Sequence, residues 1–157
     1  MRIGVLGAGT NRMNIYVVRQ ASQGLANWVK TQGGNQLVAV SYDSRINSDV
    51  FAKEAACVLA ANGIKAYVFE SLRPTPELSF AVRELKCIAG INITASHNPP
   101  EYNGYKVYWQ DGAQLPVNHA QSVTDKAAEI DIFDDVKNID FLDCNFKNLS
   151  AMGIYVT

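Results

Sequence analysis

The sequence predicts an α/β fold, a three-layer α/β/α sandwich in which helices cover both faces of a mixed, mostly parallel sheet. Short apolar runs typical of buried strands alternate with longer segments whose apolar residues recur at helical spacing. Polar or glycine-containing loops follow three of the strands. Such alternation favours a layered α/β architecture, and right-handed crossovers between parallel strands place helices on both faces.

The first half of the chain contains two strand–helix units. The apolar run at 3–6 stops at a glycine loop, and an apolar stripe at helical spacing predicts a helix over 12–30. The segment 36–42 is typical of a strand that is buried on both faces at its centre. Ser48 is a good N-cap for the second helix, and Gly63 stands where a C-terminal cap belongs.

The second half continues the pattern with three strands and two helices. The segment 65–70 is a strand, and two prolines after it introduce a helix at 77–85. Strands at 87–94 and 104–109 follow, the second ending at an Asp-Gly turn. A last helix is expected at 117–129.

These elements make residues 1–130 one expected domain. The remaining segment, 131–157, is acidic with scattered aromatic residues, and we expect a linker that leads toward further domains. Three phenylalanines are candidates for docking it onto the domain body: Phe133, Phe141 and Phe146.

The composition excludes several classes of partner. The formal net charge is -1, so no field of one sign is available to hold nucleic acid or an anionic membrane. The longest apolar runs fall well short of the ~18 residues that a membrane span needs. The three cysteines, Cys57, Cys87 and Cys144, show no metal-ligand or redox spacing. We therefore expect a reduced, cytoplasmic protein with packing cysteines.

Three loops follow strands and are the places to look for chemistry: 7–12, 43–47 and 95–103. The carboxyl ends of strands in an open α/β sheet form the ligand crevice. We expect these three loops to share that edge.

The most informative segment is 94–106, which reads TASHNPPEYNGYK in one-letter code. A strand runs into a polar loop that presents a hydroxyl, an imidazole and a carboxamide in succession, on Ser96, His97 and Asn98. Two prolines stiffen the loop, which suits a nucleophile that must meet a phosphoryl group in line. Lys106, on the next strand, returns a positive charge toward the same crevice.

These residues resemble a known family. The stretch 94–99 is similar to the active-site serine signature of the α-D-phosphohexomutases, which include phosphoglucomutase and phosphomannomutase, and 101–106 continues the likeness. The segment 7–14, GAGTNRMN, resembles the N-terminal segment of the phosphoglucomutase/phosphopentomutase branch. A third family stretch is matched by Asp-Ser-Arg at 43–45.

The resemblance implies a phosphoryl-transfer site. Ser96 is then the phosphorylated serine, with one phosphate oxygen helping to bind Mg²⁺, and His97 contacts the transferring group. Lys106 is the candidate general acid/base or charge stabiliser. The lesser contributors to substrate or phosphate binding are Arg12, Arg45 and Asn98.

The implied reaction moves phosphate between Ser96 and a hexose or pentose phosphate through a bound bisphosphate. The family's aspartate-rich metal loop, its sugar-recognition loop and its C-terminal phosphate-binding loop are absent from this sequence. We therefore expect most Mg²⁺ ligands to come from the remaining domains of a longer enzyme. The isolated chain should fold, bind metal weakly and not turn over sugar phosphates.

Three alternatives stay open on the residues alone. The glycines at 7–9 resemble the start of a dinucleotide-binding motif, although Arg12 stands at the third glycine position. A serine hydrolase would use Ser96 and His97, but adjacent residues on an extended loop point to opposite sides, and His119 is expected at the surface. The third alternative is a non-catalytic sugar-phosphate-binding module.

Overall fold

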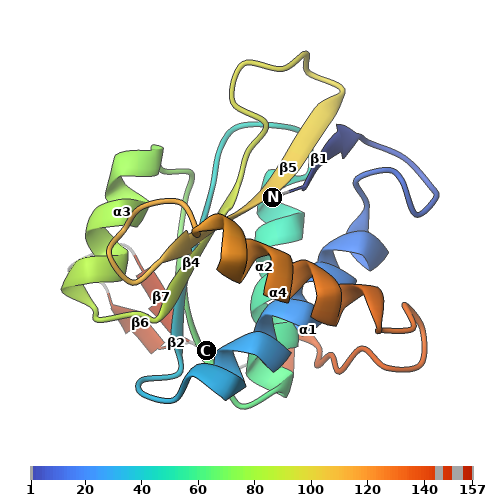
Figure 1. Cartoon of the computed structure of the whole chain (residues 1–157). Coiled ribbons are helices and arrows are strands. Elements are labelled where there is room, and N and C mark those ends of the chain that lie inside the picture. The colour runs from blue at the N-terminus through green and yellow to red at the C-terminus, as the bar shows by residue number, and fades with distance from the viewer. Residues whose placement is uncertain (1, 144–146, 150–153, 157) are drawn as a thin grey trace.

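The computed structural model describes residues 2–143, 147–149 and 154–156 (Figure 1). Its elements, in chain order, are β1 Arg2–Val5, α1 Ile15–Gln32, β2 Leu37–Tyr42, α2 Ser48–Ala61, β3 Lys65–Phe69, α3 Thr75–Glu84, β4 Ala89–Ile93, β5 Tyr102–Trp109, α4 Val117–Ala128, the 3-10 helix η1 Phe141–Asp143, β6 Lys147–Leu149 and β7 Ile154–Val156.

One mixed sheet organises these elements, with strand order β1-β5-β4-β2-β3-β7-β6. The parallel pairings are those of β2 with β3 and with β4, at the centre. The flanking pairings are antiparallel. Strands β1 and β4 each run antiparallel to β5, and β2 runs parallel to β4, so β1, β2 and β4 point in the same direction. Their carboxyl ends, and the three loops that follow them, therefore lie at the same edge of the sheet, as the sequence predicted.

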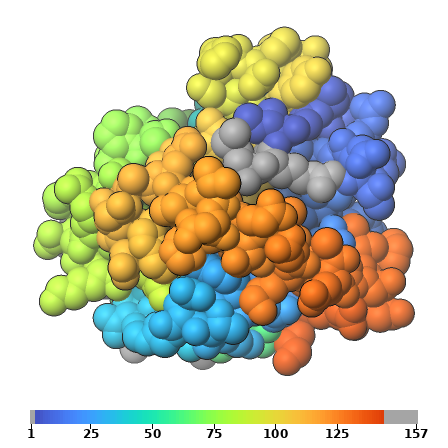
Figure 2. Space-filling view, viewed as in Figure 1, coloured from blue at the N-terminus to red at the C-terminus, as the bar shows by residue number. Residues whose placement is uncertain are grey.

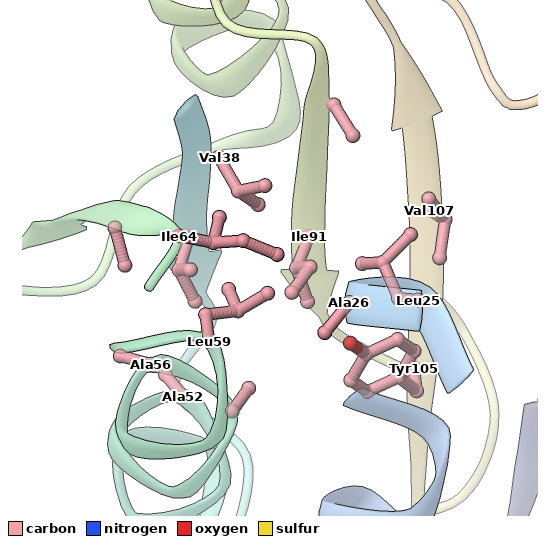
Figure 3. Close-up of a cluster of buried hydrophobic side chains, with 14 of the residues drawn as sticks. Leu25, Ala26, Val38, Ala52, Ala56, Leu59, Ile64, Ile91, Tyr105 and Val107 are labelled. Carbon is pink, nitrogen blue, oxygen red and sulfur yellow. The ribbon is translucent and has the colours of Figure 1, made fainter. Parts of the chain in front are cut away.

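Two apolar clusters pack the two faces of the sheet and confirm the α/β/α layering. The larger cluster joins α1 and α2 to the sheet through residues such as Leu25, Leu59 and Ile91 (Figure 3). On the other face α3 packs Leu78 and Val82 against the sheet. Burial of these side chains, at about 25 cal/mol per Å² of apolar surface, holds the layers together.

Helix α4 packs against α1 (Figure 1), and its Val123 joins the core cluster that also holds Val107 of β5. Figure 2 shows α4 at the surface of the molecule. The two helices touch closely at Gly24, where an added Cβ would come within 2.6 Å of the Ala127 Cβ. His119 of α4 is half-buried, because its ring stacks on Trp109 and lies 5.4 Å from the Trp28 ring. The expectation of a surface histidine is therefore wrong.

Helix starts differ from the sequence prediction by a few residues, for local reasons. Helix α1 begins at Ile15 because the Asn14 side chain caps it and accepts from the Val17 amide at 3.0 Å. Ser48 is not an N-cap but the first residue of α2. Its hydroxyl donates instead to Asp43 Oδ1, at 2.9 Å.

The segment after residue 130 follows the body of the domain as far as the structure describes it. The Phe133 ring packs edge-on against Tyr16, and Lys53 lies over the Phe141 ring. Strands β6 and β7 then add to the β3 edge of the sheet. The boundary at 130/131 stays a prediction, and the expected docking of Phe146 lies outside the described residues.

Cys57 and Cys87 are buried, as packing cysteines should be. Burial raises the pKa of Cys87 to about 12, so this thiol stays protonated at neutral pH. Cys144 lies outside the described residues. No helix formed by the described part of the chain is both long and apolar enough to cross a bilayer. The cytoplasmic location stays a prediction.

Candidate active site

The serine loop, residues 95–101, follows β4 at the carboxyl edge of the sheet and projects from one end of the molecule (Figures 1 and 2). Ser96 is exposed and has a left-handed backbone, with φ of 56°. Its amide donates to the Thr94 hydroxyl at 3.0 Å. A strained backbone at a non-glycine residue persists where surrounding contacts impose it, often at functional sites.

The left-handed turn changes how Ser96 and His97 face each other. Ser96 Oγ lies 3.4 Å from His97 Nδ1, and both side chains are exposed. The expectation that these neighbours point to opposite sides is therefore wrong, because it assumed an extended backbone. A distance of 3.4 Å is long for a hydrogen bond to a hydroxyl, so the contact is a weak one.

Asn98 closes the loop from within. Its amide side chain donates to the Ala95 carbonyl at 2.8 Å, and its backbone N–H donates to the same oxygen at 3.1 Å. Both contacts use its donors to shape the turn. Its predicted contact with substrate or phosphate stays a prediction.

Arg45 reaches the serine loop from the loop after β2 and binds its backbone. Its two terminal nitrogens donate to four carbonyl oxygens: Ser96 at 2.7 Å, Asn98 at 2.6 Å, Pro99 at 3.0 Å and Tyr102 at 3.0 Å. Its Nε lies 3.5 Å from the Asp43 carboxylate. A guanidinium has five N–H donors; the terminal nitrogens use four hydrogen bonds on the loop and the Nε faces Asp43, so Arg45 organises the serine loop.

Buried polar groups in turn hold Arg45 and Asp43 in place. Asp43 Oδ1 accepts from the Arg45 amide at 3.0 Å and from the Ser48 hydroxyl. Ser48 accepts from the Asn103 side chain at 2.9 Å, and that amide also donates to the Ile46 carbonyl. Ser48 and Asn103 are fully buried, so the network is rigid and its bonds are costly to lose.

Lys106 and Arg12 are the predicted cations whose donors stay available. Lys106 is half-buried on β5 and Arg12 is exposed in the glycine loop, and neither side chain has a hydrogen bond or ion pair within the described residues. The glycine loop lies against the serine loop, since the Leu6 amide donates to the Glu101 carbonyl at 2.8 Å. Their roles stay predictions, but both belong to the segments that meet at this edge.

The glycine loop itself is a closed turn. Gly7 and Gly9 have φ of 146° and 111°, and their carbonyls accept from the Asn14 side chain at 2.9 and 3.0 Å. Strand β1 before it pairs with β5, at the edge of the described sheet. A dinucleotide-binding motif places its first strand at the centre of a parallel sheet, so this geometry does not favour that alternative.

The described residues do not form a metal site by themselves, because no three His, Cys, Asp or Glu side chains gather among them. Magnesium prefers an octahedron of oxygens, of which a phosphate on Ser96 supplies at most a part. An apolar cavity of about 260 Å³ between α1, α4 and β5 includes Lys106 in its lining but neither Ser96 nor His97. The candidate site thus lies at an open edge of the sheet, outside that cavity.

Sequence reasoning named Ser96, His97 and Lys106 but missed the residues that support them. Ser48 and Asn103 carry no local signal of their role, because they bond each other across 55 positions of the chain. Thr94 bonds the Ser96 amide two residues away, and both Thr94 and Asn103 lie in the segment 94–106 that the family resemblance picked out.

Comparisons with known proteins identify the family to which this sequence is similar. The family model described as phosphoglucomutase/phosphomannomutase, alpha/beta/alpha domain I, matches residues 3–132. Phosphoglucomutase of Staphylococcus haemolyticus (strain JCSC1435) is 46% identical over 112 residues, 71% of this chain and 20% of the relative. Phosphoglucomutase of Staphylococcus epidermidis (strain RP62A) is 42% identical over 132 residues, 84% of this chain and 23% of the relative. The chain thus spans about a fifth of the length of these curated relatives.

Solved structures show the same fold. The crystal structure of a Thermus thermophilus protein assigned as a phosphomannomutase superposes with a TM-score of 0.76 at 30% identity. The superposition covers 87% of this chain and 30% of that one. A phosphoglucomutase/phosphomannomutase family protein of Burkholderia thailandensis gives a TM-score of 0.69 at 27% identity, over 81% of this chain and 28% of that one.

Proposed function

The chain belongs to the phosphoglucomutase/phosphomannomutase family, whose α/β/α domain I it contains, and on that premise we propose that Ser96 carries the transferred phosphoryl group. The observation that supports this most directly is the exposed, left-handed Ser96 on a loop whose backbone Arg45 holds through four carbonyls. Phosphoryl transfer depends mainly on positioning and charge stabilisation, and a preset loop supplies the first.

In the proposed reaction, phosphoserine 96 donates its phosphoryl group to a hydroxyl of a hexose or pentose monophosphate. The P–O bond to Ser96 breaks and a P–O bond to the sugar forms; the sugar hydroxyl gives its proton to a base, and the released Ser96 oxygen takes up a proton to become a hydroxyl. The bisphosphate then reorients, and its other phosphoryl group returns to Ser96, whose hydroxyl loses its proton while the released sugar oxygen takes one up. The product is the isomeric sugar monophosphate.

The residues beside Ser96 have separate roles in this proposal. Lys106 is the acid/base or charge-stabilising group, and His97 contacts the transferring phosphoryl group. Arg12 adds a positive charge from the glycine loop. Arg45 acts through the backbone of the loop rather than on phosphate.

The remaining parts of the enzyme are expected to come from beyond this chain, since it spans only 20–23% of the relatives' length. Those parts would supply the sugar-recognition groups and the oxygen ligands for Mg²⁺, whose binding site the described residues do not build. The isolated chain is therefore proposed to fold without catalysing turnover.

A chimera tests the proposal. In it, this chain replaces the matching segment of Staphylococcus haemolyticus phosphoglucomutase, and conversion of glucose 1-phosphate is measured. We expect activity in the chimera and a loss of at least about 10³-fold in Ser96→Ala, because the covalent acceptor is gone. Ser122→Ala, a change to a serine on α4 and outside the three loops, is the control and should retain activity.

Intact-mass measurement gives a second test that does not need turnover. After incubation with a sugar bisphosphate, the chimera should gain the mass of one phosphate, and Ser96→Ala should not. Phosphate that persists in Ser96→Ala, or mutase activity from that variant, would contradict the assignment. A robust mutase rate from the isolated chain would contradict its proposed inactivity.

A further inference from the structure

A row of polar side chains crosses three neighbouring strands one step inside the serine loop. Ser41 of β2 lies beside Asn92 of β4, which lies opposite Lys106 of β5. Residues in register on adjacent strands share a face of the sheet. Tyr105, next along β5, points to the opposite face, into the cluster with Leu25 of α1 (Figure 3).

This polar row lies at the N-terminal end of α3. Asn92 Nδ2 donates to the Thr75 hydroxyl at 2.9 Å, and Thr75 is the first residue of α3. The next row inward is apolar and packs under α3, where Leu78 and Val82 meet Tyr108. The polar side chains on this face therefore lie at the start of α3, beyond the part of the sheet that the helix covers.

Asn92 carries an unsatisfied group in this row. The residue is 1% exposed, and its Oδ1 has no hydrogen-bond partner in the structure. A buried polar atom without a partner is rare and calls for a specific explanation. Asn92 Nδ2 already donates to Thr75, so the atom without a partner is the acceptor Oδ1, which requires a nearby hydrogen-bond donor.

Two donors are close enough in register to serve. The Ser41 hydroxyl already donates to the Arg73 carbonyl, at 3.4 Å. Lys106 has no partner within the described residues. Directly opposite residues have Cβ atoms about 4.5–5.5 Å apart, which the four-carbon stem of a lysine spans easily. Of the two, Lys106 is therefore the better candidate to donate to Asn92 Oδ1, because it lies directly opposite Asn92 in the β4–β5 pairing.

We infer that Asn92 is a positioning residue for Lys106: the structure leaves both groups without a partner, and a rotation of the lysine side chain would let its ammonium donate to the buried Asn92 Oδ1. The contact holds the amine on the sheet face that also carries Thr94, the residue whose hydroxyl accepts from the Ser96 amide. Gly104, which accepts from the Thr94 amide at 3.0 Å, has no side chain on this face between Lys106 and the loop. The functional meaning of this position rests on the proposed role of Lys106 in phosphoryl transfer.

The test observes Lys106 directly, in the unphosphorylated chain. A ¹H–¹⁵N NMR correlation of lysine ammonium groups detects those that are hydrogen-bonded, and Lys106→Arg assigns the signal. We expect a Lys106 signal that disappears in Asn92→Leu, which keeps the side-chain shape, and that stays in Ser41→Ala. Acetylation of Lys106 at fixed pH, followed by peptide mass spectrometry, should become about 3- to 10-fold faster in Asn92→Leu.

Asn92→Asp is the conservative rescue, because a carboxylate keeps the acceptor. It should preserve the Lys106 signal and keep acetylation as slow as in the parent chain. Unchanged Lys106 signal and acetylation rate in Asn92→Leu would overturn the inference, and a signal change in Ser41→Ala alone would assign the acceptor to Ser41. Neither outcome depends on phosphate at Ser96, so failure here is distinguishable from failure of the proposed function.

A double-mutant cycle guards against a variant that merely folds poorly. If the two side chains interact, the unfolding free energies of Asn92→Leu and Lys106→Met will not add in the double variant. Additive effects would count against the contact even if both single variants fold.

Discussion

Two loops at the same edge of the sheet reach their shapes in different ways. The glycine loop, 7–14, is closed by its own Asn14, whose amide binds carbonyls five and seven residues away. The serine loop has local bonds of its own, from Asn98 to the Ala95 carbonyl, but it is also bound by Arg45, whose partners lie 51 to 57 residues further along the chain. The first loop is therefore shaped by local sequence, whereas the second also depends on the assembled sheet.

The difference also appears in the residues that carry positive φ. The glycine loop uses Gly7 and Gly9 for this conformation, in which glycine meets no steric penalty. The serine loop instead has Ser96 in this conformation, which is unfavourable for a residue with a side chain. A chemically useful side chain is thus placed where the backbone alone would favour glycine, and tertiary bonds maintain it.

Removing the long-range clamp should have the largest effect. Arg45→Met removes four bonds to carbonyls and leaves Asp43 without its cation. We expect a loss of about 2–4 kcal/mol in the free energy of unfolding, measured by urea denaturation. Amide exchange in residues 96–102 should rise. Arg73→Met on the neighbouring loop is the control, and an equal rise in exchange at the serine loop there would contradict a specific clamp.

Arg45→Lys sharpens the same point. Lysine keeps the charge but not the planar fork that binds several carbonyls together. We expect most of the loss seen with Arg45→Met and at least about 10-fold lower activity in the chimera, since misplaced reacting groups are costly. Full activity with lysine would show that charge, not geometry, is what Arg45 supplies.

Removing the local clamp should cost less. Asn14→Ala loses the N-cap of α1 and both bonds to the glycine loop, which should lower the unfolding free energy by about 1–2 kcal/mol. Asn14→Asp keeps the capping oxygen but not the amide donor. It should therefore recover part of the stability while amide exchange at 7–9 stays raised. Complete recovery of both would show that the Asn14 amide does not hold the glycine loop.

The smallest effects come from exchanging the two left-handed positions. Gly9→Ala adds a Cβ that meets no atom within 4 Å, so it isolates backbone strain and should destabilise by about 1 kcal/mol. Ser96→Gly should raise the free energy of unfolding by about 0.5 kcal/mol, because the relief of backbone strain exceeds the extra conformational entropy that glycine loses on folding. Thermal unfolding measures both, and destabilisation by Ser96→Gly would contradict a strained serine.

Much of the fold was readable in advance because its signals are local. The alternation of strands and helices, the loops at one edge and the buried apolar stripe of the first helix follow from periodicity and turn residues. Helix starts were less readable, since Asn14 and Ser48 have similar capping propensity and only their surroundings distinguish them. His119 was misjudged because its aromatic partners come from α1 and β5.

The sequence by itself indicated the candidate site residues, the order of the strands and helices along the chain, and the family to which the serine signature points. Tertiary structure alone decided that Arg45 binds backbone rather than staying free, that Ser96 turns left-handed, and that Asn92 faces Lys106. The physical reason is distance along the chain. Propensity and periodicity act over a few residues, but the pairings of Asn92 with Lys106 and of Arg45 with Tyr102 join distant positions, whose proximity exists only once the sheet has formed.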